Sequence, residues 1–134
     1  MIVVDTNVLF HSVAPGPRSM PALRVLLRDP EWAAPPLWRS EFRNVLARAM
    51  REGGMERDHA LAFLDRAAAA IGPRERHPSS PRVLDLARES GCSAYDCEFV
   101  ALAEALGVPL VTSDGEVLRK FPGIAVSMEE FGGG

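Results

Sequence analysis

The chain has 134 residues, a net charge of −3 and 47% hydrophobic residues, which suits one domain with a full hydrophobic core. The acidic balance gives no general attraction for nucleic acid, so a nucleic-acid enzyme would need local basic residues. No apolar run approaches the length of a membrane span, and no signal peptide is visible. We therefore expect a single cytoplasmic domain over residues 1–131 and a disordered glycine tail over residues 132–134.

The first residues, Met1 to Asn7, predict a short buried strand that ends on a carboxylate. Ile2, Val3 and Val4 form an apolar run, and Asp5-Thr6-Asn7 ends it because Asp and Asn favour turns. In open α/β sheets, ligands bind beyond the carboxyl ends of the strands, so Asp5 stands at a candidate site. The alternative is that Asp5 only forms the turn that starts a helix near Val8.

Helices and short strands alternate through the first half of the chain. The predicted elements are a helical turn over 8–12, a helix over 19–28 with Ser19 as its N-cap, a strand over 32–34, and helices over 35–53 and 56–70. Gly53-Gly54 joins the last two into a helical hairpin, in which Leu61 and Leu64 belong to the apolar stripe. This hairpin covers the sheet or offers a surface for a second copy or a partner protein.

The same alternation continues in the second half. The predicted elements are a helix begun by Ser80-Pro81, a helix over 94–106 capped by Ser93, a strand over 108–112, a short helix over 116–120 and a strand over 124–126. Residues 72–79 are polar and flanked by proline, which predicts only a loop or a short edge strand. Strands that alternate with helices indicate an α/β fold, a three-layer wound parallel sheet with helices on both faces.

Two carboxylates follow the two clearest strands. Asp114 comes just after the strand at 108–112, as Asp5 comes just after the first strand. If these strands are neighbours in a parallel sheet, both carboxylates lie at the same edge. The alternative for Asp114 is a purely structural role as the N-cap of the helix over 116–120.

Two further carboxylates occur on predicted helices. Glu41 lies at the edge of an apolar stripe beside Phe42, where partial desolvation requires a cation or a hydrogen-bond donor, so an ion pair is its alternative role. Asp96 stands three residues after Ser93 in the pattern of a capping box, which would account for it without any chemistry. The same position would also bring Asp96 to a helix N-terminus near the strand ends.

Carboxylates that converge repel one another unless a cation lies between them. Mg²⁺ and Mn²⁺ prefer oxygen ligands, lower the pKa of bound water and stabilise charge on a phosphoryl oxygen, which together imply phosphodiester hydrolysis. Zinc is disfavoured because the histidines and cysteines are scattered, at His11, His59, His77, Cys92 and Cys97. The two cysteines are expected to be reduced core residues rather than a disulfide.

With these residues identified, the chain resembles the PIN-domain ribonucleases, and most of all the VapC toxins of toxin–antitoxin pairs. The resemblance covers nearly the whole chain. It depends on four motifs in order: Val3-Val4-Asp5-Thr6-Asn7, Ser40-Glu41-Phe42, Ala94-Tyr95-Asp96-Cys97-Glu98-Phe99-Val100-Ala101-Leu102-Ala103 and Leu110-Val111-Thr112-Ser113-Asp114. Each motif is short, and their order and spacing together give the resemblance its specificity.

The resemblance implies that Asp5, Glu41, Asp96 and Asp114 form an acidic site that binds Mg²⁺ or Mn²⁺. It also implies supporting polar roles for Asn7 and Thr112. A five-stranded parallel sheet, a homodimer and an antitoxin that covers the site are further implications. Contact with RNA would then be made by local arginines such as Arg39 and Arg43.

Three hypotheses follow for the function. The first is a metal-dependent endoribonuclease, the toxin of a toxin–antitoxin pair. The second is a catalytically silent PIN-like module that binds RNA or protein, which pairing of the carboxylates with arginines would favour. The third is a phosphoryl-accepting receiver or phosphatase, which fits poorly because the chain has Asp5-Thr6-Asn7 rather than Asp-x-Asp and carries its one lysine at Lys120.

Overall fold

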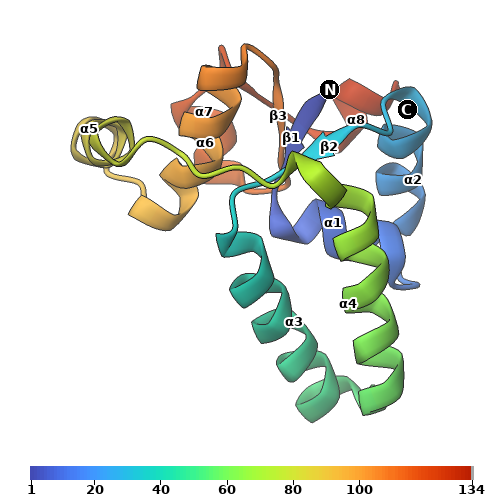
Figure 1. Ribbon diagram of the computed structural model, residues 1–134. Coiled ribbons are helices and arrows are strands. Elements are labelled where there is room, and N and C mark those ends of the chain that lie inside the picture. The colour runs from blue at the N-terminus through green and yellow to red at the C-terminus, as the bar shows by residue number, and fades with distance from the viewer. Residues whose placement is uncertain (134) are drawn as a thin grey trace.

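A computed structural model describes residues 1–133 of the chain (Figure 1). The strands are β1 (Ile2–Val4), β2 (Trp32–Ala33), β3 (Leu110–Val111) and β4 (Ala125–Val126). The helices are α1 (Thr6–Val13), α2 (Ser19–Arg28), α3 (Leu37–Gly53), α4 (Arg57–Ile71), α5 (Ser80–Ser90), α6 (Ala94–Leu106), α7 (Gly115–Lys120) and α8 (Met128–Gly132), with a 3₁₀ turn, η1 (Gly72–Arg74).

These strands form one sheet in the order β2-β1-β3-β4, and every neighbouring pair is parallel. Val4 pairs with Val111, so the residues that follow β1 and β3 leave the sheet side by side at the same edge. Figure 1 shows α6 and α7 on one side of the strands and α1 and α2 on the other. The predicted α/β class, a wound parallel sheet with helices on both faces, is confirmed.

The sheet is short but completely buried at its centre, because all three residues of β1 are apolar. Large aromatic side chains complete the core beside it. Phe42 of α3 packs edge-to-face against Trp38 and Phe10, at ring-centre distances of 5.8 and 5.9 Å. The contact with Phe10 of α1 anchors the first turns of α3 to the body of the domain, and with them Glu41.

The five-stranded sheet implied by the resemblance is wrong for the described residues, which form four strands. In the place of a fifth strand, Ala34 makes a single parallel bridge with Glu75. The prolines on either side of Glu75 have no backbone N–H to donate to a strand ladder. The charged residues next to it give no apolar face that a longer strand could bury. The edge of the sheet is therefore reduced to one bridge.

Several local predictions also need correction. Arg18, not Ser19, is the N-cap of α2, and the Ser19 hydroxyl instead donates to the carbonyl of Ala14 at 3.0 Å. α5 begins with Ser80-Pro81 as predicted, but its N-cap is Ser79 and not Ser80. In place of a disordered tail, α8 extends through Gly132 with Gly133 as its C-cap, whereas Gly134 lies outside the described residues.

α3 and α4 form the expected hairpin and extend together away from the sheet (Figure 1). Leu64 packs against the core, but Leu61 is 50% exposed although both were assigned to the buried stripe. Cys92 and Cys97 are buried free thiols, as predicted. Within residues 1–133, no helix is long and apolar enough to cross a membrane.

Candidate active site

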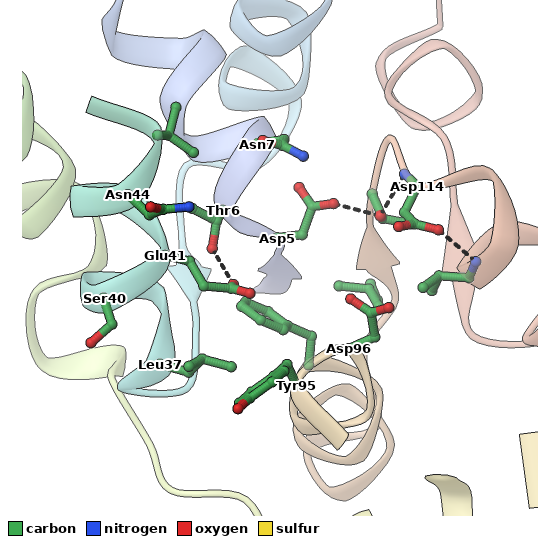
Figure 2. A pocket seen from close by; sticks show the side chains of 15 residues that line it. Asp5, Thr6, Asn7, Leu37, Ser40, Glu41, Asn44, Tyr95, Asp96 and Asp114 are labelled. Atoms are coloured by element: carbon green, nitrogen blue, oxygen red, sulfur yellow. Dashed lines mark hydrogen bonds between the residues drawn. The ribbon is translucent and has the colours of Figure 1, made fainter. Parts of the chain in front are cut away.

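A pocket of about 430 Å³ opens at the carboxyl ends of β1 and β3, where the sheet order places Asp5 and Asp114 (Figure 2). α3 forms one wall and α6 the other. All four predicted carboxylates and both supporting residues line it, together with side chains that were not predicted. The lining residues are Asp5, Thr6, Asn7, Leu37, Ser40, Glu41, Asn44, Val45, Tyr95, Asp96, Phe99, Leu110, Thr112, Asp114 and Val117.

Asp5 is fixed at the centre of the pocket by hydrogen bonds to both of its carboxylate oxygens. Oδ1 accepts from the backbone N–H of Val8 at 2.8 Å, and Oδ2 accepts from the Thr112 hydroxyl at 2.5 Å and from the N–H of Ser113 at 3.3 Å. Burial raises the pKa of Asp5 in spite of these bonds, and repulsion from Asp114 raises it further. The Asx-turn role of Asp5 is therefore real, and it coexists with a place in the pocket.

Asp114 is positioned in the same way on the neighbouring strand. Its Oδ1 caps α7 by accepting from the N–H of Val117 at 3.0 Å, and its own N–H donates to the hydroxyl of Thr112 at 3.0 Å. The Thr112 hydroxyl thus donates to one carboxylate residue and accepts from the next. Thr112 is almost completely buried, so this link between the two acids is shielded from water.

Glu41 lies on α3, which forms the wall of the pocket opposite α6. Its Oε1 accepts from the hydroxyl of buried Thr6 at 2.8 Å, which fixes the carboxylate over the start of α1. Burial raises the pKa of Glu41, and repulsion from Asp96, Asp5 and Glu98 adds to that rise. These repulsions arise because acids from separate elements face one another across the pocket.

Asp96 stands in the first turn of α6, where the Ser93 hydroxyl accepts from the backbone N–H of Asp96 at 3.0 Å. The cap therefore uses the backbone of Asp96 and leaves its carboxylate facing the pocket (Figure 2). Burial raises the pKa of Asp96, followed by repulsion from Asp114. Both predicted roles of Asp96, the cap position and the pocket acid, are compatible.

The two arginines predicted for RNA contact do not line the pocket. Arg39 pairs with Glu75 at 2.8 Å and lies over the ring of Trp38, so its charge is already matched. Arg43 is exposed and donates to the hydroxyl of Ser40, which does line the pocket, at 3.3 Å. Of the two, Arg43 keeps the better position for a bound polyanion.

The polar and aromatic lining residues that sequence reasoning did not assign to the site include Ser40, Asn44 and Tyr95. Asn44 lies three positions after Glu41 on α3, and residues at that spacing are neighbours on a helix, so its place was available in the sequence. Ser40 and Tyr95 directly precede Glu41 and Asp96, and adjacent helical residues point in different directions, so only the fold shows that they reach the pocket. Thr6 likewise finds Glu41 only through the fold.

The raised pKa values predict how pH changes stability when no metal is present. A carboxyl group whose pKa is higher in the folded protein stabilises the fold below its ordinary pKa and loses that stabilisation as pH rises through the folded value. Glu41→Gln removes one such group and can keep the bond from Thr6. In chelator we therefore expect the variant to match the wild type near pH 4 and to be the more stable protein at pH 7.

Urea denaturation at a series of pH values measures this difference in the free energy of unfolding. Glu104→Gln is the matched control, because its pairing with Arg82 lowers the pKa of Glu104 and reverses the sign. A Glu41→Gln variant that is less stable than the wild type at pH 7 would contradict the account of a strained acidic cluster.

Comparison with known proteins agrees with this geometry. The family model "PIN domain" matches residues 2–123, so the chain belongs to the PIN domain family. Among curated proteins it is similar to ribonuclease VapC1 of Mycobacterium tuberculosis, with 34% identity over 124 residues and 91% of each chain. It is also similar to ribonuclease VapC3 of Pyrobaculum aerophilum, with 29% identity over 126 residues, 92% of this chain and 96% of the other.

Solved structures show the same fold. PAE2754 from Pyrobaculum aerophilum superposes with a TM-score of 0.75 at 27% identity, covering 98% of this chain and 92% of that one. A toxin–antitoxin complex from Klebsiella pneumoniae contains a chain with a TM-score of 0.68 at 19% identity, covering 96% and 98%. The resemblance read from the four motifs, a PIN domain of the VapC kind, is confirmed.

Proposed function

We propose that this chain is a metal-dependent endoribonuclease, the toxin of a toxin–antitoxin pair. The observation that carries the proposal is one pocket at the strand ends that contains Asp5, Glu41, Asp96 and Asp114. The names of the two ribonuclease relatives support RNA as the substrate. The four acids provide oxygen ligands for a divalent cation, which phosphodiester hydrolysis of this kind requires.

The donor set fits Mg²⁺ or Mn²⁺. All four acids present oxygen, and among the described residues that line the pocket there is no His, Cys, Lys or Arg. A phosphate entering this pocket would meet only negative charge, so a divalent cation is the missing counter-charge. Within residues 1–133, no three His, Cys, Asp or Glu side chains are grouped closely enough to hold one ion. Mg²⁺ in proteins typically uses one or two carboxylates and keeps several waters.

When bound, such an ion lowers the pKa of a water molecule and stabilises negative charge on the phosphoryl oxygens. The protein contributes orientation. Thr112 and Val8 fix the carboxylate of Asp5, and Thr6 fixes that of Glu41, so these two acids present their oxygens from opposite walls without rearrangement. Fixed charges of this kind are effective because they need not reorganise during the reaction.

The alternative of a catalytically silent module predicted that arginines would pair with the acids. In the part of the chain that the structure describes, the arginine ion pairs involve other acids, namely Glu75, Glu129, Asp58, Glu104 and Asp85. The pocket acids therefore remain available for a cation, which supports the enzyme rather than the module.

Incubating labelled single-stranded RNA with the wild-type protein tests the proposal. We expect no cleavage in chelator and internal cleavage after Mg²⁺ or Mn²⁺ is added. A panel of single-stranded and structured RNAs that stays intact with both ions, in the presence of folded protein, would overturn the proposed function. Cleavage that persists in chelator would contradict its metal dependence.

We also propose that the protein forms a homodimer and binds a protein antitoxin, with the hairpin of α3 and α4 as the contact surface. One structural neighbour is part of a toxin–antitoxin complex, which suggests the second partner. The hairpin extends away from the sheet in Figure 1 and carries exposed apolar side chains, Met50 and Leu61. Exposed apolar groups on a projecting element are typical of interaction surfaces.

Leu61→Glu tests the dimer proposal, because it places a charge on this surface without disturbing the core. We expect the dimer dissociation constant to rise at least about 10-fold, since burying a leucine is worth roughly 1.5–3 kcal/mol. Sedimentation velocity measures the change, with Leu27→Glu on α2 as the control because Leu27 is 86% exposed on another element. Equal association of both variants and the wild type would reject the hairpin as the dimer surface.

A further inference from the structure

Tyr95 is the only tyrosine of the chain, and its side chain is 63% exposed although it lines the pocket. It stands in the first turn of α6, directly before Asp96. An aromatic ring contributes to folding by burying its apolar faces, and most of this ring is left in solvent. The described fold therefore uses little of the stacking capacity of Tyr95.

The surroundings of Tyr95 differ from the acidic centre of the pocket. Figure 2 shows Tyr95 and Leu37 at one end of the pocket, next to Glu41 and Asp96, with Ser40 farther along the wall formed by α3. This end is lined by an aromatic ring, an aliphatic side chain and a neutral hydroxyl. None of these groups is a strong metal ligand, but each is suited to a flat, polar-edged organic ring.

Asn44 adds a hydrogen-bonding group to the same wall. It lies one helical turn from Ser40 on α3, is exposed, and lines the pocket. Among residues 1–133 its side-chain amide makes no hydrogen bond, so both its donors and its acceptor are available. An amide can both donate to and accept from the edge of a nucleobase.

We propose that Tyr95 stacks on one unpaired nucleobase of the RNA beside the cleaved phosphodiester bond, with Leu37 across from it and the Asn44 amide facing the base edge. This inference rests on the proposed function and assigns to it a base-contacting residue, Tyr95. A pocket of about 430 Å³ lies within the range of small-ligand sites, about 300–1,000 Å³, and admits a splayed nucleotide. A base inside a duplex keeps both faces stacked and cannot use the ring.

Steady-state cleavage of a 10-nucleotide single-stranded RNA with Mn²⁺ tests the inference. For Tyr95→Ala we expect kcat/KM to fall by about 5- to 150-fold, the range for loss of one base–aromatic stack, chiefly through KM. Tyr95→Phe keeps the ring and is expected to stay within about twofold of the wild type. Leu84→Ala is the matched control, because Leu84 is 65% exposed on α5 and lies outside the pocket.

RNAs with a single abasic ribose near the cleavage site give a second arm. When the base is missing at the contacted nucleotide, kcat/KM of the wild type should fall by the same factor as the Tyr95→Ala substitution causes on intact RNA. The kcat/KM of Tyr95→Ala itself should change little on the abasic RNA. Abasic RNAs that penalise both proteins equally, or a Tyr95→Phe variant as impaired as Tyr95→Ala, would overturn stacking.

Fluorescence anisotropy of the labelled RNA in Ca²⁺, an oxygen-liganded cation that supplies the counter-charge, reports binding, and a gel confirms that the RNA stays intact during the titration. Absence of cleavage by the wild type in Mn²⁺ therefore overturns the proposed function alone. Equal RNA affinity of the wild type and Tyr95→Ala in this titration overturns the stacking inference. Weaker binding by Tyr95→Ala with Tyr95→Phe unchanged supports it.

Discussion

Replacing Asp96 by asparagine is expected to lower the rate of metal-dependent RNA cleavage by about 10²–10³-fold, the usual cost of losing one preorganised charged or polar group in an active site. The fold should survive, because the substitution leaves the bond from the backbone N–H of residue 96 to the Ser93 hydroxyl in place, and an amide oxygen can replace the carboxylate beside that hydroxyl. Removing the charge also relieves repulsion from Asp114. Single-turnover cleavage, with thermal unfolding as the folding check, measures the effect.

Two controls separate the catalytic role of Asp96 from its place in the cap. Ser93→Ala removes the cap and keeps the carboxylate, so we expect a loss of about 1 kcal/mol in stability with cleavage largely retained. Asp85→Asn removes an exposed acid on α5 and should change neither property. An Asp96→Asn variant that cleaves RNA at the wild-type rate would show that the pocket acid has no catalytic role.

Thr112→Val is expected to damage both stability and activity, because the hydroxyl of Thr112 makes two buried hydrogen bonds to the site. It donates to Asp5 at 2.5 Å and accepts from the N–H of Asp114 at 3.0 Å. Thr112 is 1% exposed, so water does not replace the lost partner and each orphaned group costs about 1–3 kcal/mol. Loss of a group that orients metal ligands typically reduces activity by about 10- to 100-fold.

Thr112→Ser is the matched control, since it keeps the hydroxyl and removes only a methyl group. We expect this variant to recover most of the activity that Thr112→Val loses. Urea denaturation and single-turnover cleavage on the three proteins measure the two effects. A valine variant as active as the serine variant would mean that the link between Asp5 and Asp114 does not position the acids.

The sequence was sufficient to predict where the acids of two strands meet. Asp5 and Asp114 each follow an apolar run, and the edge at which parallel strands end is a matter of topology that follows from alternating helices and strands. Glu41 and Asp96 could be located on helices by pattern. The cap position of Asp96 at a helix N-terminus already indicated that it lies near the strand ends, whereas the approach of Glu41 followed only from the family resemblance.

The contacts that fix or occupy these side chains could not be predicted, because they join segments distant in the chain. Thr6 donates to Glu41, 35 residues away, and Arg39 pairs with Glu75, 36 residues away. Nothing in the local pattern of either segment encodes its partner. The single bridge between Ala34 and Glu75 could not be predicted for the same reason, because the length of an edge strand depends on which distant residues can pair with it.

Local sequence patterns also gave wrong assignments where two nearby residues fit the same structural role equally well. Ser79 and Ser80 both precede Pro81, and the cap went to Ser79, which leaves proline in the first turn of α5. Leu61 and Leu64 both fit an apolar stripe, yet the buried face of α4 contains Ala60, Ala67 and Ile71, with Leu64 packed against it and Leu61 outside it. Periodicity finds an apolar stripe but not which side of that stripe the fold buries.

The most direct test of the account is a calorimetric titration of Mn²⁺ into the wild-type protein and into Asp96→Asn. The account predicts saturable uptake by the wild type and at least about 10-fold weaker uptake by the variant, in parallel with the loss of RNA cleavage. Equal uptake by both proteins, or cleavage by a wild type that takes up no Mn²⁺, would contradict the claim that these carboxylates hold the ion that the reaction uses.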